Sequence, residues 1–219
     1  MEVIDCDVLV IGAGAIGLAS AAKLATQGKN VILLEKANLV GSATSSRNSE
    51  VIHSGIYYRE DSLKTQLCIR GKQLLYEYLK ERSISHDECG KIIFCNDQSQ
   101  EDKLEVLNQN AQNRNIKVRY SDSHALKKIN EVADAKLALE VDDTGIFDSH
   151  SYFQCLISDI EHNFGLVSLN TKVLAIDMCY NKMQSLCEQN HEKFIVRSQY
   201  VLNTSGAEAL KLIKQNFPQ

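Results

Sequence analysis

A glycine-rich turn near the start of the chain limits most strongly what the chain can fold into. Gly12, Gly14 and Gly17 have the spacing Gly-x-Gly-x-x-Gly and directly follow a short apolar run at residues 8–11. That run is typical of a central parallel strand buried on both faces. Residues 15–27 are rich in Ala, Leu and Lys, which favour a helix. The sequence therefore predicts a strand, a tight turn and a helix in direct succession.

The three glycines have separate steric roles in such a turn. Gly12 permits the tight turn, Gly14 leaves room for a diphosphate beside the backbone, and Gly17 lets the helix pack closely on the strand. The helix would then direct its free N–H groups and the positive end of its dipole at the phosphates. The turn therefore predicts a dinucleotide site.

An acidic residue completes the pattern at the end of the next predicted strand. Gly28 suits the C-terminal cap of the helix, and residues 31–34 predict a second buried strand. Glu35 follows Gly17 by 18 positions, close to the roughly 20 at which an acid meets the ribose hydroxyls. An acid there disfavours a 2′-phosphate, so NADP is the least expected dinucleotide. These residues do not distinguish FAD from NAD.

Composition excludes several other classes of function. The chain has 219 residues, 44% of them hydrophobic, with a formal net charge of −4, which suits one or two globular domains. This balance gives no electrostatic footprint for nucleic acid. No apolar run is long enough for a transmembrane helix, and the first one follows Glu2 and Asp5 where a secretory signal would be positive. We expect a cytoplasmic location.

The cysteines predict neither disulfides nor a metal site. There are seven, and no two of them form a Cys-x-x-Cys pair, so we interpret them as reduced thiols. His86, Cys89 and Cys95 lie close together in the sequence, but their spacing matches no zinc pattern. We expect no metal.

A long segment without periodicity, residues 37–62, follows Glu35. It is rich in small polar residues, yet Val51, Ile52 and Ile56 should anchor it. Ordered loops of this length are uncommon unless they have a function. We therefore favour a functional loop over a flexible solvent loop.

The rest of the chain alternates between helical and strand patterns, with a more polar α+β stretch at 88–144. We expect helices at 63–82, 98–114, 121–129 (capped by Ser121 or Ser123), 149–164 and 207–215, and strands at 90–95, 137–141, 166–168, 171–178, 182–197 (a hairpin) and 200–205. Residues 143–148 predict a turn. The strand that leads to Gly206 could return the chain to the cofactor or merely end another α/β unit.

Several segments together resemble a known family. They are residues 4–17, 34–36, 44–58 (Thr-Ser-Ser-Arg-Asn-Ser-Glu-Val-Ile-His-Ser-Gly-Ile-Tyr-Tyr), 62–68, 89–91, 144–148 and 201–206. The chain resembles the FAD-dependent oxidoreductases of the D-amino-acid oxidase superfamily, and segment 44–58 is most similar to L-2-hydroxyglutarate dehydrogenases and oxidases. The resemblance implies an α/β fold: a Rossmann-like FAD-binding domain, with a parallel sheet and a β-meander, into which a partial α+β substrate domain is inserted. Its segments would be 1–87 (FAD-binding), 88–144 (substrate) and 145–219 (FAD-binding).

The same resemblance implies a set of FAD-binding residues. They are Gly12, Gly14, Ala15, Ile16 and Gly17 at the pyrophosphate, Glu35 and Lys36 at the adenosine ribose, Thr44, Ser45, Ser46 and Arg47 at the phosphates and flavin, Val173 at the adenine, and Ser205 and Gly206 at the returning contact. His53 and Gly55 would lie near the isoalloxazine ring.

His53 is the catalytic candidate within that loop. Its ordinary pKa, about 6.5, suits a base that accepts a hydroxyl proton near neutral pH; a structural or FAD-packing role is the alternative. A 2-hydroxy dicarboxylate substrate would also need cations, and Arg47, Arg59, Lys64 and Arg70 are near in sequence. Surface solvation explains most of these equally well.

Two features depart from the family. Glu50 stands where the loop commonly has glycine, and the chain is about half the usual length, ending soon after residue 206. We therefore expect an FAD-dependent oxidoreductase that oxidises a 2-hydroxy acid, with a partner chain as a possible source of the other half. The alternatives are a truncated or split FAD-binding module without independent activity, and a related flavoenzyme acting on an amine or on glycerol 3-phosphate.

Overall fold

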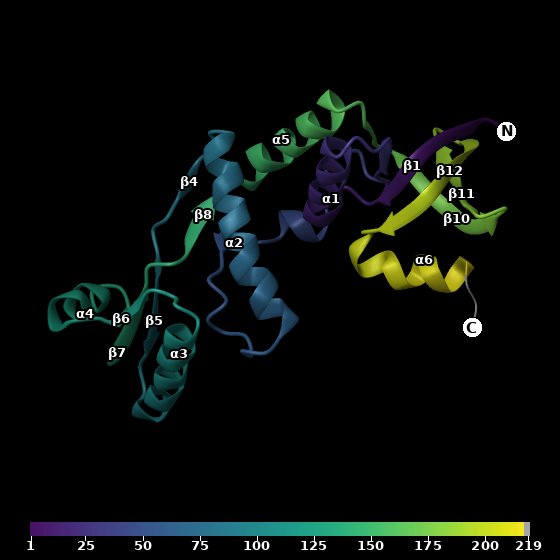
Figure 1. The fold of residues 1–219 in the computed structure, drawn as a ribbon. Helices are drawn as coiled ribbons and strands as arrows, with labels where there is room; N and C mark the ends of the chain where they lie inside the picture. Colours follow the sequence, from purple (N-terminus) through teal and green to yellow (C-terminus); the bar gives the residue numbers. More distant parts are fainter. Residues whose placement is uncertain (217–219) are drawn as a thin grey trace. The chain divides into compact units, whose positions relative to one another are not determined.

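The computed structural model of the protein describes residues 1–216, which form two compact units. The first unit combines Met1–Asn48 with the chain from His150 onward, and the second is Ser49–Ser149 (Figure 1). None of the helices in the described residues is long and apolar enough to cross a membrane.

The first unit contains a mixed sheet in the order β10-β11-β12-β1-β2-β9. Its strands are β1 (Val3–Ile11), β2 (Val31–Leu34), β9 (Leu166–Ser168), β10 (Thr171–Cys179), β11 (Lys182–Gln189) and β12 (Glu192–Asn203). Strands β12, β1, β2 and β9 pair in parallel, whereas β10, β11 and β12 form an antiparallel meander. The predicted α/β class, with a parallel sheet and a β-meander, is confirmed.

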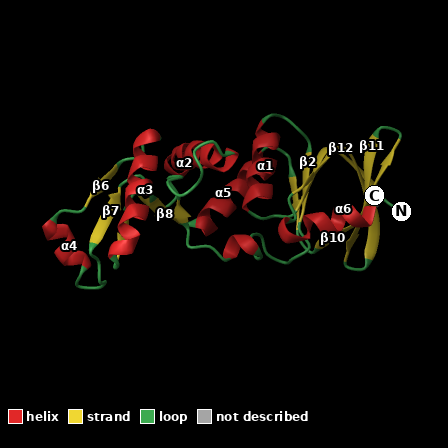
Figure 2. Cartoon of the chain, turned by 90° about the horizontal axis from the view of Figure 1, so that it is seen from below, coloured by secondary structure: helices red, strands yellow, loops and turns green. Residues whose placement is uncertain are grey.

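The central strands of this sheet are buried on both faces, as their apolar runs predict. Alternation along β1 and β2 sends Leu9 and Leu34 into one core, which also contains Val196 of β12 and Leu212 of α6 (Ala209–Asn216). Residues of the opposite parity, such as Val10, are equally buried on the other face. Helix α1 (Ala15–Thr26) packs on β1 and β2, and α6 packs on β10 (Figure 2).

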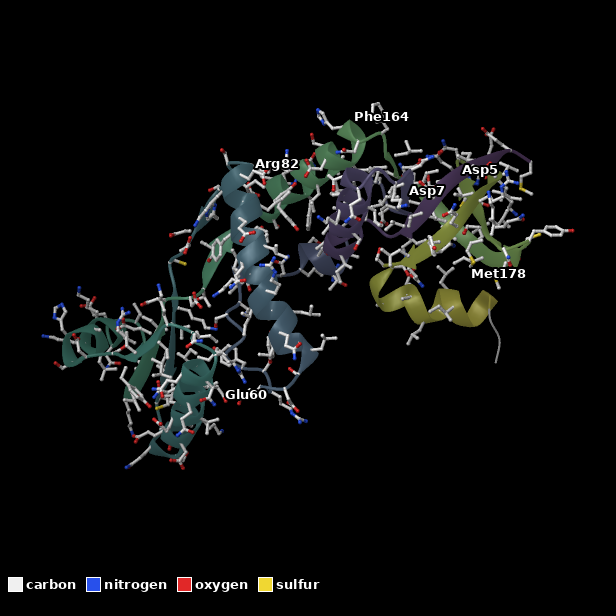
Figure 3. The ribbon with its side chains drawn as sticks, viewed as in Figure 1. Asp5, Asp7, Glu60, Arg82, Phe164 and Met178 are labelled. Atoms are coloured by element: carbon white, nitrogen blue, oxygen red, sulfur yellow. The ribbon has the colours of Figure 1, made fainter. Side chains whose placement is uncertain are left out.

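Strand β1, near the start of the chain, pairs in parallel with β12, near its end, in a defined register. Asp5 lies directly opposite Arg197, and the carboxylate accepts two guanidinium hydrogen bonds of 2.7 Å (Figure 3 labels Asp5). These bonds hold the pKa of Asp5 below its ordinary value. Because both side chains are exposed, the ion pair marks the register more than it stabilises the fold.

The second unit contains two three-stranded sheets, in the orders β3-β8-β4 and β5-β7-β6. The strands are β3 (Val51–Ile52), β4 (His86–Asp87), β5 (Lys91–Cys95), β6 (Val118–Tyr120), β7 (Leu137–Val141) and β8 (Gly145–Phe147). The helices are α2 (Leu63–Glu81), α3 (Glu101–Asn113) and α4 (Ser123–Ile129). Helix α3 packs on β5, β6 and β7, and its Ala111 shares a buried cluster with Val141 and Ile56.

Three local expectations differ from the structure. The helix at α4 is capped by Asp122, whose carboxylate accepts the Ala125 N–H at 2.8 Å, and neither Ser121 nor Ser123 is its cap. Gly145–Phe147 is a strand, because it pairs with both β3 and β4. Helix α5 (Ser149–His162) ends two residues earlier than predicted. Elements of two or three residues are set by tertiary pairing and carry little periodicity.

The units divide the chain at other residues than the expected boundaries, 87/88 and 144/145. Residues 49–87 cluster with 88–149, and Tyr76 of α2 contacts His86 of β4 within this unit. A Cβ atom at Gly145 would overlap the Tyr76 hydroxyl of α2, and the Lys72 ammonium of α2 pairs with Asp143. Residues 217–219 of the predicted third segment lie outside the described residues. Which segment binds cofactor and which binds substrate stays a prediction.

We expect Leu9→Ala to lower the free energy of unfolding by about 2 to 5 kcal/mol, because truncating a fully buried side chain in the central strand leaves a cavity. Val3→Ala is the control in the same strand: Val3 is 48% exposed, and its truncation should cost no more than about 0.5 kcal/mol. Urea unfolding followed by circular dichroism compares the two. Equal midpoints would contradict the central position of β1.

Candidate nucleotide-binding site

The turn between β1 and α1 is closed by backbone contacts that exclude side chains. Gly12 has φ +100°, in the region that favours glycine, and a Cβ there would lie 2.8 Å from the Thr204 carbonyl oxygen. A Cβ at Gly17 would overlap the Gly12 carbonyl oxygen. Both glycines therefore have the steric roles that the sequence predicted for them.

The start of α1 offers main-chain N–H groups without a side-chain cap. Gly14 is the N-cap residue and makes no side-chain cap hydrogen bond, and the first turn has no acidic residue. Ser45 Oγ accepts the Ala15 N–H at 3.0 Å, and Ile16 is 73% exposed. A helix start that lacks a cap from its own N-cap residue favours an anion. This end of α1 therefore fits a diphosphate, and the structure brings Ser45 to it.

Glu35 lies at the carboxyl ends of β1 and β2, held by two main-chain hydrogen bonds. Its carboxylate accepts the Ala13 N–H at 2.8 Å and the Ala37 N–H at 2.9 Å. The sequence predicted Glu35 but gave Ala13 no role. Ala13 is fully buried here. The one signal for this in the sequence is its small size between two glycines.

Backbone pairing brings the start of β10 to the same edge of the sheet. The Thr171 N–H donates to the Glu35 carbonyl oxygen at 2.8 Å, and the Asn170 N–H donates to that of Ala37 at 3.0 Å. Val173 follows in β10, beside an irregularity in the pairing, with its side chain in the core. Val173 can therefore offer a ligand its main chain and not its side chain.

The second strand-to-glycine junction returns to the first one. The Thr204 hydroxyl donates to the carbonyl oxygens of Ile11 and Gly12 at 2.8 and 3.0 Å. Ser205 Oγ donates to Asn203 Oδ1 at 2.6 Å, and Gly206 has φ +61°. The junction thus lies against the glycine turn, and Thr204, to which the sequence gave no role, fixes the contact.

The other predicted binding residues of this unit are exposed. Thr44 and Ser46 belong to a short 3₁₀ helix (Thr44–Ser46) that ends at Arg47. The Lys36 ammonium pairs with the Glu208 carboxylate at 2.5 Å, and both side chains are more than half exposed. Glu208 therefore holds the Lys36 ammonium group. The sequence analysis assigned Glu208 no role.

His53 belongs to the second unit, so its position relative to the nucleotide residues stays a prediction. The Cys68 Sγ donates to its carbonyl oxygen at 3.3 Å. Partial burial lowers the pKa of the His53 imidazole below its ordinary value, and the ammonium groups of Lys91 and Lys64 lower it further. The lowered pKa favours the neutral imidazole, the form that can accept a proton.

Glu50, which departs from the family pattern, occupies a backbone conformation that favours glycine. Its φ is +57°, and its carboxylate accepts hydrogen bonds from the main-chain N–H and the hydroxyl of Ser149 at 3.1 and 2.5 Å. Glycine adopts such a positive φ more readily than other residues. At Glu50 the hydrogen bonds to Ser149 offset the free-energy cost of this backbone conformation. Among the described residues, no three His, Cys, Asp or Glu side chains are placed to hold a metal ion.

The sequence pattern of the DAO family, the FAD-dependent oxidoreductases, matches residues 7–219. The chain belongs to this family. It is 33% identical to the mitochondrial L-2-hydroxyglutarate dehydrogenase of Arabidopsis thaliana, over 95% of this chain and 49% of that protein. It is 31% identical to the Homo sapiens enzyme of the same name, over 91% and 46%. The chain thus spans about half the length of these relatives.

Solved structures of two oxidases share the fold. L-α-glycerophosphate oxidase of Mycoplasma pneumoniae, with FAD bound, has a TM-score of 0.88 at 24% identity and covers 99% of this chain and 57% of its own. Glycine oxidase of Geobacillus kaustophilus has a TM-score of 0.84 at 20% identity, over 96% and 58%. Membership of the family confirms the prediction of an FAD cofactor.

Two expectations about the cellular setting need correction. The cytoplasmic location is wrong, because the L-2-hydroxyglutarate dehydrogenases that the chain resembles are mitochondrial proteins. The expectation depended on the lack of a recognisable signal in the first residues, and such a lack does not determine location. The expected partner chain finds no support in the relatives.

We expect Gly17→Ala to reduce both FAD binding and stability, because its Cβ would overlap the Gly12 carbonyl oxygen and displace the turn. Gly71→Ala in α2 is the matched control: no atom lies within 4 Å of its added Cβ, and Ala should stabilise that helix by up to about 1 kcal/mol. Flavin content after reconstitution and the unfolding midpoint measure both effects. A Gly17→Ala protein with full flavin content would contradict the close packing at this turn.

Proposed function

We propose that this chain binds FAD and oxidises a 2-hydroxy acid of the L-2-hydroxyglutarate type to the 2-oxo acid. The observation that carries the proposal is the uncapped start of α1 beside the bare glycine turn, with Glu35 at the same edge. The names of the relatives at 33% and 31% identity support the choice of substrate.

The residues of the first unit divide the cofactor between them in this proposal. Main-chain N–H groups at Gly14–Gly17 hold the diphosphate, together with the 3₁₀ helix at 44–46 and Arg47. A carboxylate oxygen can accept more than one hydrogen bond, so Glu35 can bind ribose hydroxyls while it keeps Ala13 and Ala37. Residues 173 and 205–206 supply main-chain contacts at the adenine and at the returning junction.

His53 is the proposed base for the substrate hydroxyl. FAD, when bound, accepts the hydride from the carbon that carries the hydroxyl group. Neutral His53 then needs only to lie within hydrogen-bond reach of that hydroxyl to accept its proton. The lowered pKa of His53 keeps the imidazole ready for this role at neutral pH.

Anaerobic addition of L-2-hydroxyglutarate to the FAD-loaded protein tests the reaction directly. We expect the absorbance of the oxidised flavin to bleach in a single turnover, with one 2-oxoglutarate formed for each flavin reduced. Glycerol 3-phosphate and glycine are the comparison substrates for the alternative flavoenzyme. Bleaching by either one, with none by L-2-hydroxyglutarate, would reject the proposed substrate; a bound flavin that no substrate reduces would favour an inactive FAD-binding module.

We expect His53→Ala to slow flavin reduction by about 10²- to 10⁴-fold, the usual contribution of a general base, while the FAD content stays unchanged. His124→Ala is the control, since His124 is exposed on α4. Stopped-flow absorbance measures the rate for both. An unchanged rate in His53→Ala would leave His53 a structural role only.

The rate of flavin reduction should rise with pH along an acid limb that lies below about pH 6.5. The rate rises with pH because His53 must be deprotonated to act as a base. The limb lies at low pH because burial, Lys91 and Lys64 lower the pKa of His53. Lys91→Gln removes one of the two cations, so the limb should move to higher pH. A limb that stays in place would contradict the proximity of Lys91 to the base.

A further inference from the structure

Two ammonium groups of the second unit lie on two neighbouring tyrosine rings. Lys64 Nζ lies 4.1 Å from the centroid of the Tyr58 ring, and Lys91 Nζ lies 4.2 Å from that of Tyr57. Lys64 comes from α2 and Lys91 from β5, so the fold places each cation on one of two tyrosines that are adjacent in the sequence. The aromatic faces hold both side chains in defined positions.

Neither of these lysines has a carboxylate partner in the described part of the chain. Other lysines of α2 do: Lys72 pairs with Asp143, and Lys80 pairs with Glu88 at 2.9 Å. Lys91 is partly buried, and this burial lowers the pKa of its ammonium group. A partly buried cation without a counter-ion is costly, and a bound anion would remove that cost.

The start of α2 adds to the positive potential at this place. The helix begins at Leu63 after its N-cap residue Ser62, whose hydroxyl accepts the Thr65 N–H at 3.2 Å; its first turn has no acidic residue and contains Lys64. A cation at the N-terminus of a helix opposes the helix dipole, whereas an anion is favoured there. The location of Lys64 is therefore unfavourable for the protein alone and favourable for binding an anion.

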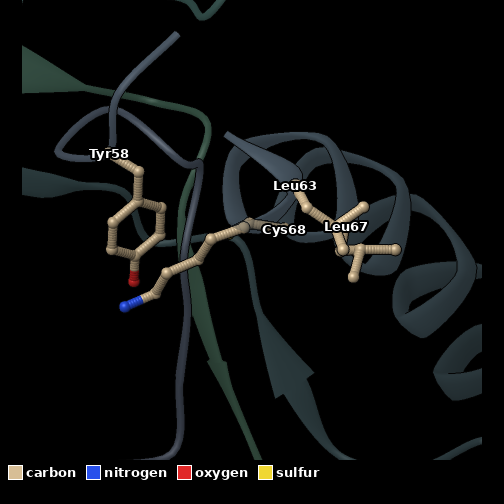
Figure 4. Close-up of a pocket in the computed structure, with 5 residues that line it drawn as sticks. Tyr58, Leu63, Leu67 and Cys68 are labelled. Carbon is tan, nitrogen blue, oxygen red and sulfur yellow. The ribbon is translucent and has the colours of Figure 1, made fainter. Parts of the chain in front are cut away.

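Both cations act on the same imidazole, and Lys64 also borders a surface hollow. Lys91 and Lys64 each lower the pKa of His53, so both ammonium groups are close to the proposed base. Lys64 also lines an open surface hollow of about 520 Å³ with Tyr58 and Cys68 (Figure 4). Its remaining wall is Leu63 and Leu67, which are 68% and 61% exposed. That wall suits the methylene carbons of a short aliphatic acid.

We propose that Lys64 and Lys91 form a carboxylate-binding subsite for a small dicarboxylate, and that this subsite selects dicarboxylates over monocarboxylates. The inference rests on the proposed function, because it assigns the subsite to the substrate of His53. Two separate point charges and an apolar wall suit two carboxylates joined by methylene groups. A phosphate would favour a cluster of donors around a single group.

Glutarate is the probe, since it has both carboxylates and no hydroxyl group to oxidise. We expect it to bind the FAD-loaded protein, and butyrate to bind at least roughly tenfold more weakly, as expected for the loss of one charged contact. Lys64→Gln and Lys91→Gln should each weaken glutarate roughly tenfold by calorimetry, and Lys91→Arg should restore most of the binding. Lys80→Gln, on the same helix but paired with Glu88, should leave the affinity unchanged.

Three results would overturn the subsite: equal glutarate affinity in the wild type and the double variant, equal affinity for butyrate and glutarate, or a lysine-dependent affinity for inorganic phosphate above that for glutarate. Each variant is first checked for an unchanged unfolding midpoint and flavin content. Lysine-dependent glutarate binding without flavin reduction by L-2-hydroxyglutarate would reject the proposed function and keep the subsite. Flavin reduction by L-2-hydroxyglutarate with an unchanged KM in Lys64→Gln and in Lys91→Gln would reject the subsite and keep the proposed function.

Discussion

The contact between the end of β12 and the first glycine turn is the constraint on which the nucleotide site depends. One hydroxyl, that of Thr204, bonds the carbonyl oxygens of Ile11 and Gly12, and the approach is possible only because Gly12 and Gly17 lack a Cβ. Parallel pairing of β1 and β12 brings these segments together from the two ends of the chain. The turn, the start of α1 and the position of Glu35 are all fixed from this point.

The two units offer anions two different kinds of recognition. The first presents main-chain N–H groups at an uncapped helix start, whose partial charges are fixed in direction and cost no side-chain entropy. The second presents whole charges, the ammonium groups of Lys64 and Lys91, held over tyrosine rings. A diphosphate, with many oxygens, suits the former. A small carboxylic acid, with separate point charges, suits the latter.

Glu50 shows how a residue other than glycine can hold a left-handed backbone conformation. A left-handed φ at a residue other than glycine costs of order 1 kcal/mol. The two hydrogen bonds that its carboxylate accepts from Ser149 supply a compensation of similar size. The carboxylate is thus held locally by two donors of Ser149, the first residue of α5.

The sequence by itself determined the βαβ unit, its glycines and Glu35, because steric exclusion and hydrophobic periodicity are local properties that each residue carries with it. It also determined the family, through the segment that contains His53. Only the tertiary structure decided the roles of Ala13, Thr204 and Glu208, the strand at 145–147 and the division of the chain at residues 48/49 and 149/150. It alone placed Lys64 on Tyr58 and Lys91 on Tyr57. Such contacts join residues far apart in the sequence, and they follow from strand register and packing, which no short pattern encodes.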